Sequence, residues 1–453
     1  MKLVFVHGWS VTDTETYGDL PEALVARSGV PIDVQHIHLG RYISFHDEVS
    51  MDDVTRAFNA ALVDTLGDGA GNIAPFSCVT HSTGGPVVRE WIRRFYWHLG
   101  APIVPLQHLV MLAPANHGSS LAALGKKRVG RIKAWFQGVE PGQRILDWLC
   151  LGSEGQWRLN EEALLHAAGA EGFYPFVLTG QAIDHKFYDF LNSYLVEKGS
   201  DGVVRVAGAN MNCGFLQLQQ TDHALSEDPL VYSLVPEGGL RRPAPIPLGV
   251  VPDASHSGAD IGIMNSVTVA NAGEKPVVDE ILKCFDVQSP GDYQQRLQDL
   301  AQLTAASQQG GARYLMVVFQ VRDDRGETIR DYDLLLLGEG YAPERLPKGF
   351  FVDRQFNALS GRLVYYVNAD LMREMPALGF RVEARPSEGF SHYAMAEFRS
   401  DGLNVADILK ANETLYVDIV LRRRVSKNVF EFGPVSEKPF SFKKLKPSTD
   451  LLP

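Results

Sequence analysis

Over its first 285 residues the chain alternates short apolar runs with segments of helical periodicity. Such alternation is typical of a parallel sheet whose strands are joined by crossover helices. In residues 87–95, for example, large apolar side chains recur at spacings of three and four, which predicts a helix with one buried face. We therefore expect an α/β domain with a mostly parallel sheet over residues 1–288. The expected strands cover residues 2–6, 32–38, 76–80, 106–112, 175–179 and 245–251.

Two long stretches interrupt this alternation, at about 119–172 and 206–248. The first contains Trp135, Phe136 and Trp148 at helix-like spacings, where a two-layer sheet needs only a short crossover. The second is similarly long and irregular in pattern. We expect both to be insertions at the edge of the sheet, and two interpretations stay open: extra packing helices, or a cap or lid over a pocket.

The character of the chain changes after residue 288. Residues 289–311 are polar and rich in glutamine and end in Gly310-Gly311, which indicates a linker with one short helix. Beyond it, six or more short strand-like runs are separated by turn residues, the pattern of an all-β domain. We expect a β-sandwich-like accessory domain over residues 312–453.

Composition and motifs narrow the function classes. The formal net charge is −11 at pH 7 and no long run of lysine and arginine occurs, which argues against a nucleic-acid partner. No stretch of about 18 apolar residues occurs, and the N-terminal apolar run is too short for a signal-peptide core. The four cysteines form no CxxC pair, and their even number permits disulfides. Because no signal-peptide core is found, free and mostly buried thiols and a cytoplasmic location are expected. Without HExxH, CxxC, EF-hand or glycine-rich nucleotide motifs, the sequence predicts neither metal nor cofactor.

Residues 76–85, Phe-Ser-Cys-Val-Thr-His-Ser-Thr-Gly-Gly, predict a strand, a sharp turn at Ser82 and the start of a helix. This is the setting of a nucleophile elbow, in which a strained serine is exposed at the end of a strand. Small residues must lie two positions away so that strand and helix can pass closely. Gly84 meets this demand on one side, whereas Thr80 stands where a glycine is usual on the other. The helix would direct its N-terminal N–H groups and its dipole toward the serine. The alternative is an ordinary strand-turn-helix with a capping serine.

A second strand end carries the residues His7-Gly8-Trp9. Acyl transfer needs two backbone N–H groups at the oxyanion, one from the residue after the nucleophile and one from a strand-end loop. Thr83 is expected to supply the first N–H group and Trp9 the second. His7 is expected to brace this loop and not to act as a base.

Two later loops carry a candidate acid and a candidate base. Asp201 lies in Ser-Asp-Gly-Val-Val, where a carboxylate could sit beyond a strand end, and His256 lies in a loop of small residues after the last expected strand. A histidine in that loop can reach a serine across the carboxyl edge of the sheet. The chain order Ser82, Asp201, His256 is the order expected for this architecture. Asp184 and His223 are the alternative acid and base.

These motifs resemble the α/β-hydrolase superfamily, and more narrowly its bacterial serine lipases and phospholipases. In that family a His-Gly pair follows the first strand, and a serine elbow, an Asp-Gly-x-Val loop and a late histidine loop follow in order. His7-Gly8, Ser82, Asp201 and His256 match these places, and residues 112–119 are similar to the family's Pro-His-x-Gly-Ser segment. The chain is also similar to type VI secretion lipase effectors in lacking a signal peptide, which implies leaderless secretion as an alternative to a cytoplasmic location.

The resemblance implies a serine carboxylester hydrolase that acts on lipid esters through a Ser-His-Asp triad and an acyl-enzyme intermediate, without a cofactor. One alternative is a thioesterase, amidase or acyltransferase with the same triad, and another is a catalytically inactive hydrolase fold used for binding. The apolar stretch 133–150 would suit an acyl-chain wall or lid. The C-terminal domain either orients the enzyme in peripheral contact with a membrane or only packs against the catalytic domain.

Overall fold

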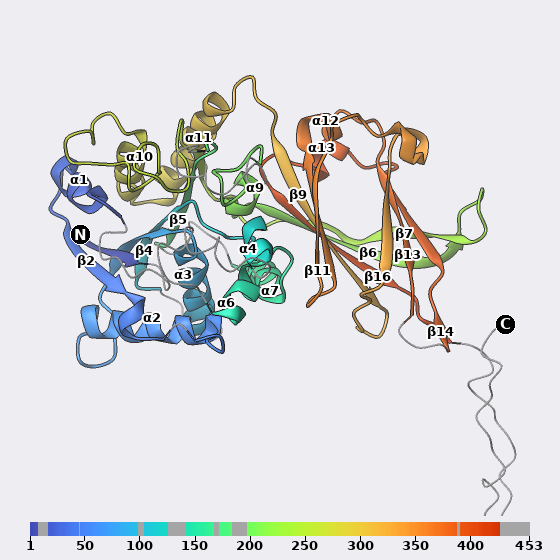
Figure 1. The fold of residues 1–453 in the computed structure, drawn as a ribbon, viewed down its shortest axis with the longest axis horizontal. Helices are drawn as coiled ribbons and strands as arrows, with labels where there is room; N and C mark the ends of the chain where they lie inside the picture. Colours follow the sequence, from blue (N-terminus) through green and yellow to red (C-terminus); the bar gives the residue numbers. More distant parts are fainter. Residues whose placement is uncertain are drawn as a thin grey trace, which may run out of the picture.

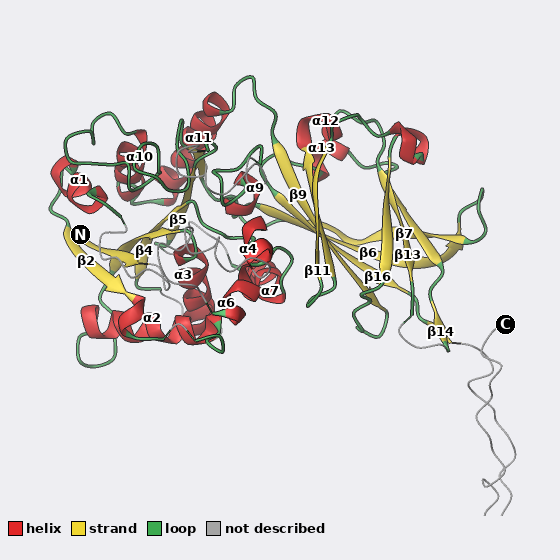
Figure 2. Cartoon of the chain, viewed as in Figure 1, coloured by secondary structure: helices red, strands yellow, loops and turns green. Residues whose placement is uncertain are grey.

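The computed structural model describes residues 1–7, 17–44, 46–97, 104–125, 142–166, 172–183, 197–386 and 390–425. Within these ranges the chain forms two bodies that lie side by side (Figure 1). The α/β body is built on a six-stranded sheet, and the β body is built on a nine-stranded sheet (Figure 2).

The six-stranded sheet confirms the expected α/β fold. Its strand order is β2-β1-β3-β4-β5-β8, and every neighbouring pair is parallel. The strands of this sheet are β1 (Lys2–His7), β2 (Asp33–His38), β3 (Phe76–His81), β4 (Leu106–Leu112), β5 (Tyr174–Thr179) and β8 (Leu248–Val250).

Helices cover both faces of this sheet. Because strand side chains alternate between the two faces, Leu3 and Val4 of β1 belong to different hydrophobic cores. Helices α2 and α3 pack on the face that includes Val4, whereas α1, α10 and α11 pack on the face that includes Leu3. These helices are α1 (Leu20–Arg27), α2 (Met51–Leu66), α3 (Gly84–Ile92), α10 (Pro276–Phe285) and α11 (Pro290–Ser307).

Residues 289–311, expected to be a linker with one short helix, contain the 18-residue helix α11. Ser289 caps its N-terminus. Tyr293 and Leu300 are buried in the core of the α/β body, and the Tyr293 hydroxyl donates to the carbonyl of Pro175 at 2.9 Å. The helix therefore packs on the first sheet. The sequence pattern hid this because only a narrow stripe of its side chains is apolar.

The segment 119–172 contributes three α-helices in its described parts. They are α4 (Ser120–Gly125), α6 (Gln143–Leu149) and α7 (Glu154–Glu162). Ile145 and Leu146 are buried in the core of the α/β body, and Trp157 is buried between the two bodies. In these parts the segment consists of packing helices, while Trp135 and Phe136 lie outside the described residues.

The second sheet confirms the expected all-β domain, and it is one curled sheet of nine strands (Figure 2). Its order is β10-β13-β15-β7-β6-β16-β9-β12-β11. The strands that follow α11 are β9 (Tyr314–Asp323), β10 (Tyr332–Leu337), β11 (Phe351–Asn357), β12 (Arg362–Asn368), β13 (Gly379–Ala384), β15 (Met395–Arg399) and β16 (Thr414–Leu421). A separate two-stranded ladder pairs β14 (Ser391–His392) with β17 (Arg424–Val425).

The middle of the second sheet comes from the segment 206–248, which we expected to be an irregular insertion. Strands β6 (Cys213–Ala224) and β7 (Val231–Arg241) form an antiparallel hairpin there, between β15 and β16. This corrects the expected organisation, because the hairpin belongs to the β body although the chain then returns to β8 of the first sheet. The pattern of β7 was hidden by Gly238 and Gly239, both at positive φ, where its pairing with β6 shifts register.

One face of the second sheet packs against the α/β body. Phe215 and Tyr416 stack with ring centroids 4.5 Å apart, and Trp157 of α7 meets Tyr416 edge-on at 5.0 Å. Leu151 and Ala207 of the α/β body complete this cluster of buried residues. The contact between the bodies is therefore a packed aromatic core, the kind of contact that fixes two domains relative to one another.

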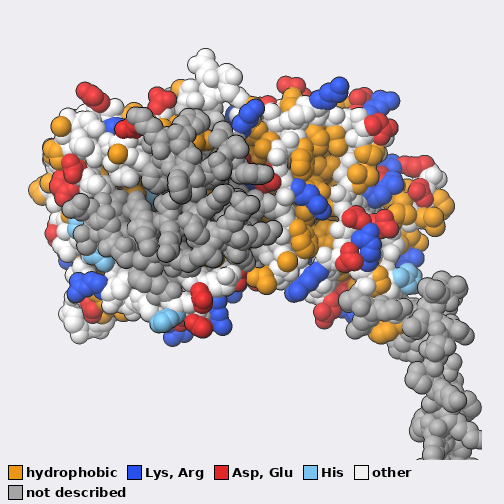
Figure 3. Space-filling model, viewed as in Figure 1, with side chains coloured by type: hydrophobic (Ala, Val, Ile, Leu, Met, Phe, Trp, Pro, Cys, Tyr) orange, Lys and Arg blue, Asp and Glu red, His pale blue; other side chains and the backbone are white. Residues whose placement is uncertain are grey.

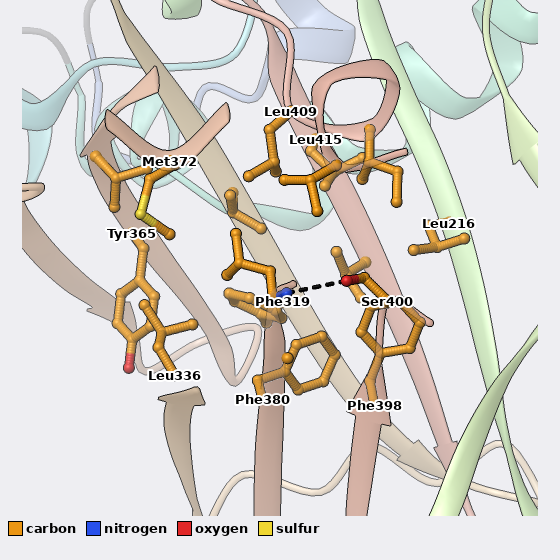
Figure 4. A pocket seen from close by; sticks show the side chains of 17 residues that line it. Leu216, Phe319, Leu336, Tyr365, Met372, Phe380, Phe398, Ser400, Leu409 and Leu415 are labelled. Atoms are coloured by element: carbon orange, nitrogen blue, oxygen red, sulfur yellow. Dashed lines mark hydrogen bonds between the residues drawn. The ribbon is translucent and has the colours of Figure 1, made fainter. Parts of the chain in front are cut away.

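The opposite face of the second sheet carries its own core and a pocket. Two short helices, α12 (Ala369–Arg373) and α13 (Val405–Ile408), contribute to its wall. The pocket has a volume of roughly 640 Å³, part of it open to solvent, and Phe319, Phe380 and Phe398 lie in its lining (Figure 4). The Ser400 hydroxyl in this lining accepts the N–H of Leu378 at 2.9 Å. Figure 3 shows hydrophobic side chains gathered on the visible face of the β body.

Candidate active site

The turn after β3 places Ser82 at the carboxyl edge of the first sheet. Strand β3 ends at His81, and α3 begins at Gly84. Ser82 has φ of +53°, in the left-handed region that residues with a side chain rarely adopt. Its N–H donates to the carbonyl of Leu112 on the neighbouring strand at 3.0 Å. Ser82 therefore occupies a strained turn that a tertiary hydrogen bond holds in place.

The close passage of β3 and α3 explains the residues around this turn. A Cβ added at Gly84 would lie 3.1 Å from the Cβ of Thr80, and one added at Gly85 would lie 2.8 Å from the Cβ of Pro114. Thr80, which stands where a glycine is usual, fits because its side chain fills the space beside Gly84. Its hydroxyl Oγ1 is buried without a hydrogen-bond partner.

The structure brings Ser82, His256 and Asp201 into contact. The Nε2 atom of His256 lies 3.2 Å from Oγ of Ser82, and its Nδ1 atom lies 3.0 Å from Oδ2 of Asp201. Asp201 and His256 are both buried. In this geometry the imidazole can take a proton from the serine while the carboxylate stabilises the resulting cation.

Backbone groups hold the Asp201 carboxylate. Its Oδ1 accepts the N–H groups of Val203 and Val204 at 2.9 and 2.7 Å, which leaves Oδ2 for His256. The N–H of His256 also donates to the carbonyl of Asp201 at 3.0 Å. These contacts fix both the orientation of the carboxylate and its distance from the imidazole.

His81 supports the histidine loop. Its Nε2 lies 3.0 Å from the carbonyl oxygen of His256, which can only accept, so Nε2 of His81 carries the proton. Burial lowers the pKa of His81 well below its ordinary value, and the neighbouring His256 adds to this effect. His81 is therefore neutral, and it contacts His256 through its ring, at 4.6 Å between centroids, and through the bond to the His256 carbonyl.

The expected oxyanion donors are only partly within the described residues. Thr83 directly follows Ser82 and is the N-cap residue of α3, so its N–H has no acceptor within the helix. Trp9 lies outside the described residues, as does Gly8. His7 is the last residue of β1 and pairs with His38 of β2.

Of the alternative acid and base, only His223 lies within the described residues. Asp184 lies outside the described residues. His223 is exposed near the end of β6, in the second sheet. His117 is buried and forms hydrogen bonds with Asn210 and Tyr416.

Residues that hold the Asp201 loop were not found from the sequence. Arg205 is 2% exposed and pairs with Glu197 and with Asp353 of β11. Asp353 lies 148 positions away in the sequence, so no local spacing could have linked it to this loop. A buried arginine is rare unless it pairs with carboxylates, but this tendency does not predict which carboxylates they are.

The described ranges contain no group of three or more His, Cys, Asp or Glu side chains that could hold a metal ion. Cys78, Cys150, Cys213 and Cys284 are buried free thiols. No helix in these ranges has the length and apolar character needed to cross a bilayer.

The chain is similar to a phospholipase over nearly its whole length. No protein-family model and no curated protein matches it. Among solved structures, phospholipase PlaB from Legionella pneumophila shares 42% sequence identity with a TM-score of 0.86, covering 97% of both chains. The same phospholipase in complex with thio-NAD shares 41% identity, with the same TM-score and coverage. Both bodies of the chain therefore lie within the similarity.

Proposed function

Because the chain belongs to the α/β-hydrolase family of the phospholipase PlaB, we propose that it is a serine hydrolase of phospholipid and related lipid esters that uses Ser82, His256 and Asp201. The observation that carries the proposal is the pair of contacts from His256, 3.2 Å to Ser82 and 3.0 Å to Asp201. The strained turn at Ser82 and the open end of α3 beside it add support.

In the proposed reaction, Nε2 of His256 takes the proton of Ser82 as Oγ attacks the ester carbonyl carbon. The imidazolium then protonates the leaving lipid alcohol, and an acyl-serine forms. The same imidazole then takes a proton from water, whose oxygen attacks the acyl-serine, and returns that proton to Oγ of Ser82 as the acyl–oxygen bond breaks and the fatty acid leaves. Asp201 accepts the Nδ1–H of His256 throughout, which fixes the tautomer and stabilises the cation.

The negative oxygen of the tetrahedral intermediate needs donors that are already in place. We assign this role to the backbone N–H groups of Thr83 and Trp9. Loss of one such donor costs about 3–4 kcal/mol of transition-state stabilisation in comparable enzymes. The dipole of α3 acts in the same direction because its N-terminus follows Ser82 directly.

A substrate panel with a matched pair of variants tests the proposal. Wild type, Ser82→Ala and Ser226→Ala are compared on p-nitrophenyl esters from acetate to palmitate, on phospholipid vesicles, and in labelling by a fluorophosphonate probe. Ser226 is an exposed serine of the β body, so its variant controls for the substitution itself. We expect Ser82→Ala to lose ester hydrolysis and labelling together, while Ser226→Ala keeps both.

The alternatives give different outcomes in the same panel. Preference for thioesters or amides over all oxygen esters, or transfer of the acyl group to an acceptor other than water, would replace lipid hydrolysis with another acyl-transfer reaction. Absence of both hydrolysis and labelling in the wild type would favour a binding protein and contradict the triad.

A further inference from the structure

We propose that the β body positions the catalytic carboxylate: Asp353 and Tyr366 of the second sheet hold Arg205, and Arg205 fixes the loop that carries Asp201. This inference rests on the proposed catalytic role of Asp201. It makes Arg205, Asp353 and Tyr366 positioning residues, since none of them touches Ser82 or His256.

The loop around Asp201 is a short turn closed at its base. The N–H of Val206 donates to the carbonyl of Gly199 at 2.9 Å, and Ser200 forms an isolated bridge with Arg205. The N–H of Asp201 donates to the carbonyl of Val204 at 3.2 Å. Contacts that hold the base of this turn, at Gly199 and Val206, therefore also determine the position of the Asp201 carboxylate.

Arg205 ties the base of the turn to the second sheet. Its guanidinium donates to both carboxylate oxygens of Glu197, at 2.9 and 2.5 Å, and also to Asp353 of β11. The same guanidinium lies 4.2 Å from the ring centroid of Tyr366 on β12. Arg205 is 2% exposed, while the side chains of Glu197 and Asp353 are 17% and 32% exposed, so these charge-assisted bonds are partly shielded from water.

Tyr366 also contacts the other side of the base. Its hydroxyl lies 2.9 Å from the carbonyl oxygen of Lys198 and 3.2 Å from that of Gly199, so it donates to this stretch of backbone. Gly199 has φ of +74°, and a Cβ added there would lie 2.5 Å from both Tyr314 and the Tyr366 hydroxyl. The backbone thus lies directly against the second sheet at the point where the turn begins.

The segment that leaves the turn is held by the same sheet. The Thr414 hydroxyl of β16 donates to the carbonyl of Ala207 at 2.9 Å, and the Asn210 side chain donates to the carbonyl of Asn412 at 2.7 Å. The β body therefore bonds the chain on both sides of Asp201. Because misplacement of a catalytic group by about 1 Å can cost on the order of 100-fold in rate, loosening this support should slow the chemical step.

Two mild variants test the inference. Arg205 itself is unsuitable, since its removal would leave two carboxylates unpaired against the core. Asp353→Ala leaves Arg205 paired with Glu197, and Tyr366→Phe removes only the hydroxyl. Asp333→Ala is the matched control, because Asp333 is an exposed carboxylate of the same sheet that pairs with Arg385.

For Asp353→Ala and Tyr366→Phe we expect kcat on a soluble ester to fall on the order of tenfold, with KM within about twofold of wild type. We also expect an unchanged far-ultraviolet circular dichroism spectrum. Asp333→Ala should keep wild-type kcat. The decisive comparison repeats Asp353→Ala in an Asp201→Asn background. There Asp353→Ala should lower kcat by less than about twofold, because the variant acts on kcat by displacing the Asp201 carboxylate.

Three results would overturn the inference. The first is wild-type kcat in both variants, and the second is a loss that only follows a fall in the folded fraction. The third is an undiminished loss in the Asp201→Asn background. If instead Asp201→Asn and Ser82→Ala both keep wild-type activity, it is the proposed triad that fails.

Discussion

His117 offers a quantitative test of how the interface between the two bodies is built. Its Nε2 lies 2.6 Å from the carbonyl oxygen of Asn210, so Nε2 carries the proton, and Nδ1 accepts the hydroxyl of Tyr416 at 2.7 Å. Both ring nitrogens are thus used by the neutral form. Burial, helped by the charge of Arg89, lowers the pKa of His117 to about 3.

The sign and size of the pH effect follow from this pKa. In the unfolded chain His117 has the ordinary value of 6.5, so between pH 6.5 and pH 3 the unfolded state binds a proton that the native state does not. The native state is therefore favoured above pH 6.5, and this contribution is lost as the pH falls below it. At about 1.36 kcal/mol per pH unit, acidification to pH 5.0 removes about 2 kcal/mol of stability through this one side chain.

The assay is urea-induced unfolding of wild type and His117→Gln at pH 7.5 and pH 5.0. We expect wild type to lose about 2 kcal/mol more than the variant between these two values. Other buried histidines with lowered pKa, such as His108, contribute equally to both proteins and cancel. His223→Gln, which changes an exposed histidine, should behave as wild type does. Equal pH dependence in wild type and His117→Gln would refute the reasoning.

Two further predictions concern a buried hydroxyl and two buried thiols. Thr80→Val removes a buried hydroxyl without a partner and keeps the side-chain shape. The urea midpoint of unfolding should therefore rise by the equivalent of about 1 kcal/mol. An unchanged or lower midpoint would mean that the hydroxyl finds a partner. Burial raises the pKa of Cys213 and of Cys284 to about 12, so a disulfide reagent at pH 8 should label these thiols only after unfolding, as followed by mass spectrometry of the peptides.

The first sheet and the proposed triad could be predicted because their signals are local. Each strand is a short apolar run, and each crossover helix has a buried stripe, so their alternation appears in the sequence itself. The turn at Ser82 is marked by Gly84, which the structure explains by the close approach to Thr80. The order of Ser82, Asp201 and His256 follows from the architecture, since all three lie in loops near one edge of the sheet.

The sequence predicted that a β domain follows residue 312, but it did not predict which strands make up the sheet. Six strands beyond residue 312 can be predicted from their short apolar runs and from the turn residues between them. The pairing of β16 with β6, however, joins Thr414 to Cys213 across about two hundred residues, and no local pattern encodes such a partner. The hairpin β6–β7 was therefore assigned to the wrong body, and the contacts of Arg205 with the second sheet stayed hidden.

Along the chain, the hairpin β6–β7 lies between Asp201 and His256. The chain passes Asp201, leaves the first sheet to form β6 and β7 in the second, and returns through β8 to His256. Asp201 and His256 are 55 positions apart, and more than half of that span lies in β6, β7 and the turn between them. Along their outer edges, β7 pairs with β15 and β6 pairs with β16, and both partner strands follow residue 312 in the sequence. Deletion of residues 312–453 would remove both partner strands of the hairpin and expose its core side chains, so such a deletion would disturb the proposed support of the Asp201 loop together with any membrane contact. Only point changes at Asp353 and Tyr366, which leave the sheet intact, can separate the two roles.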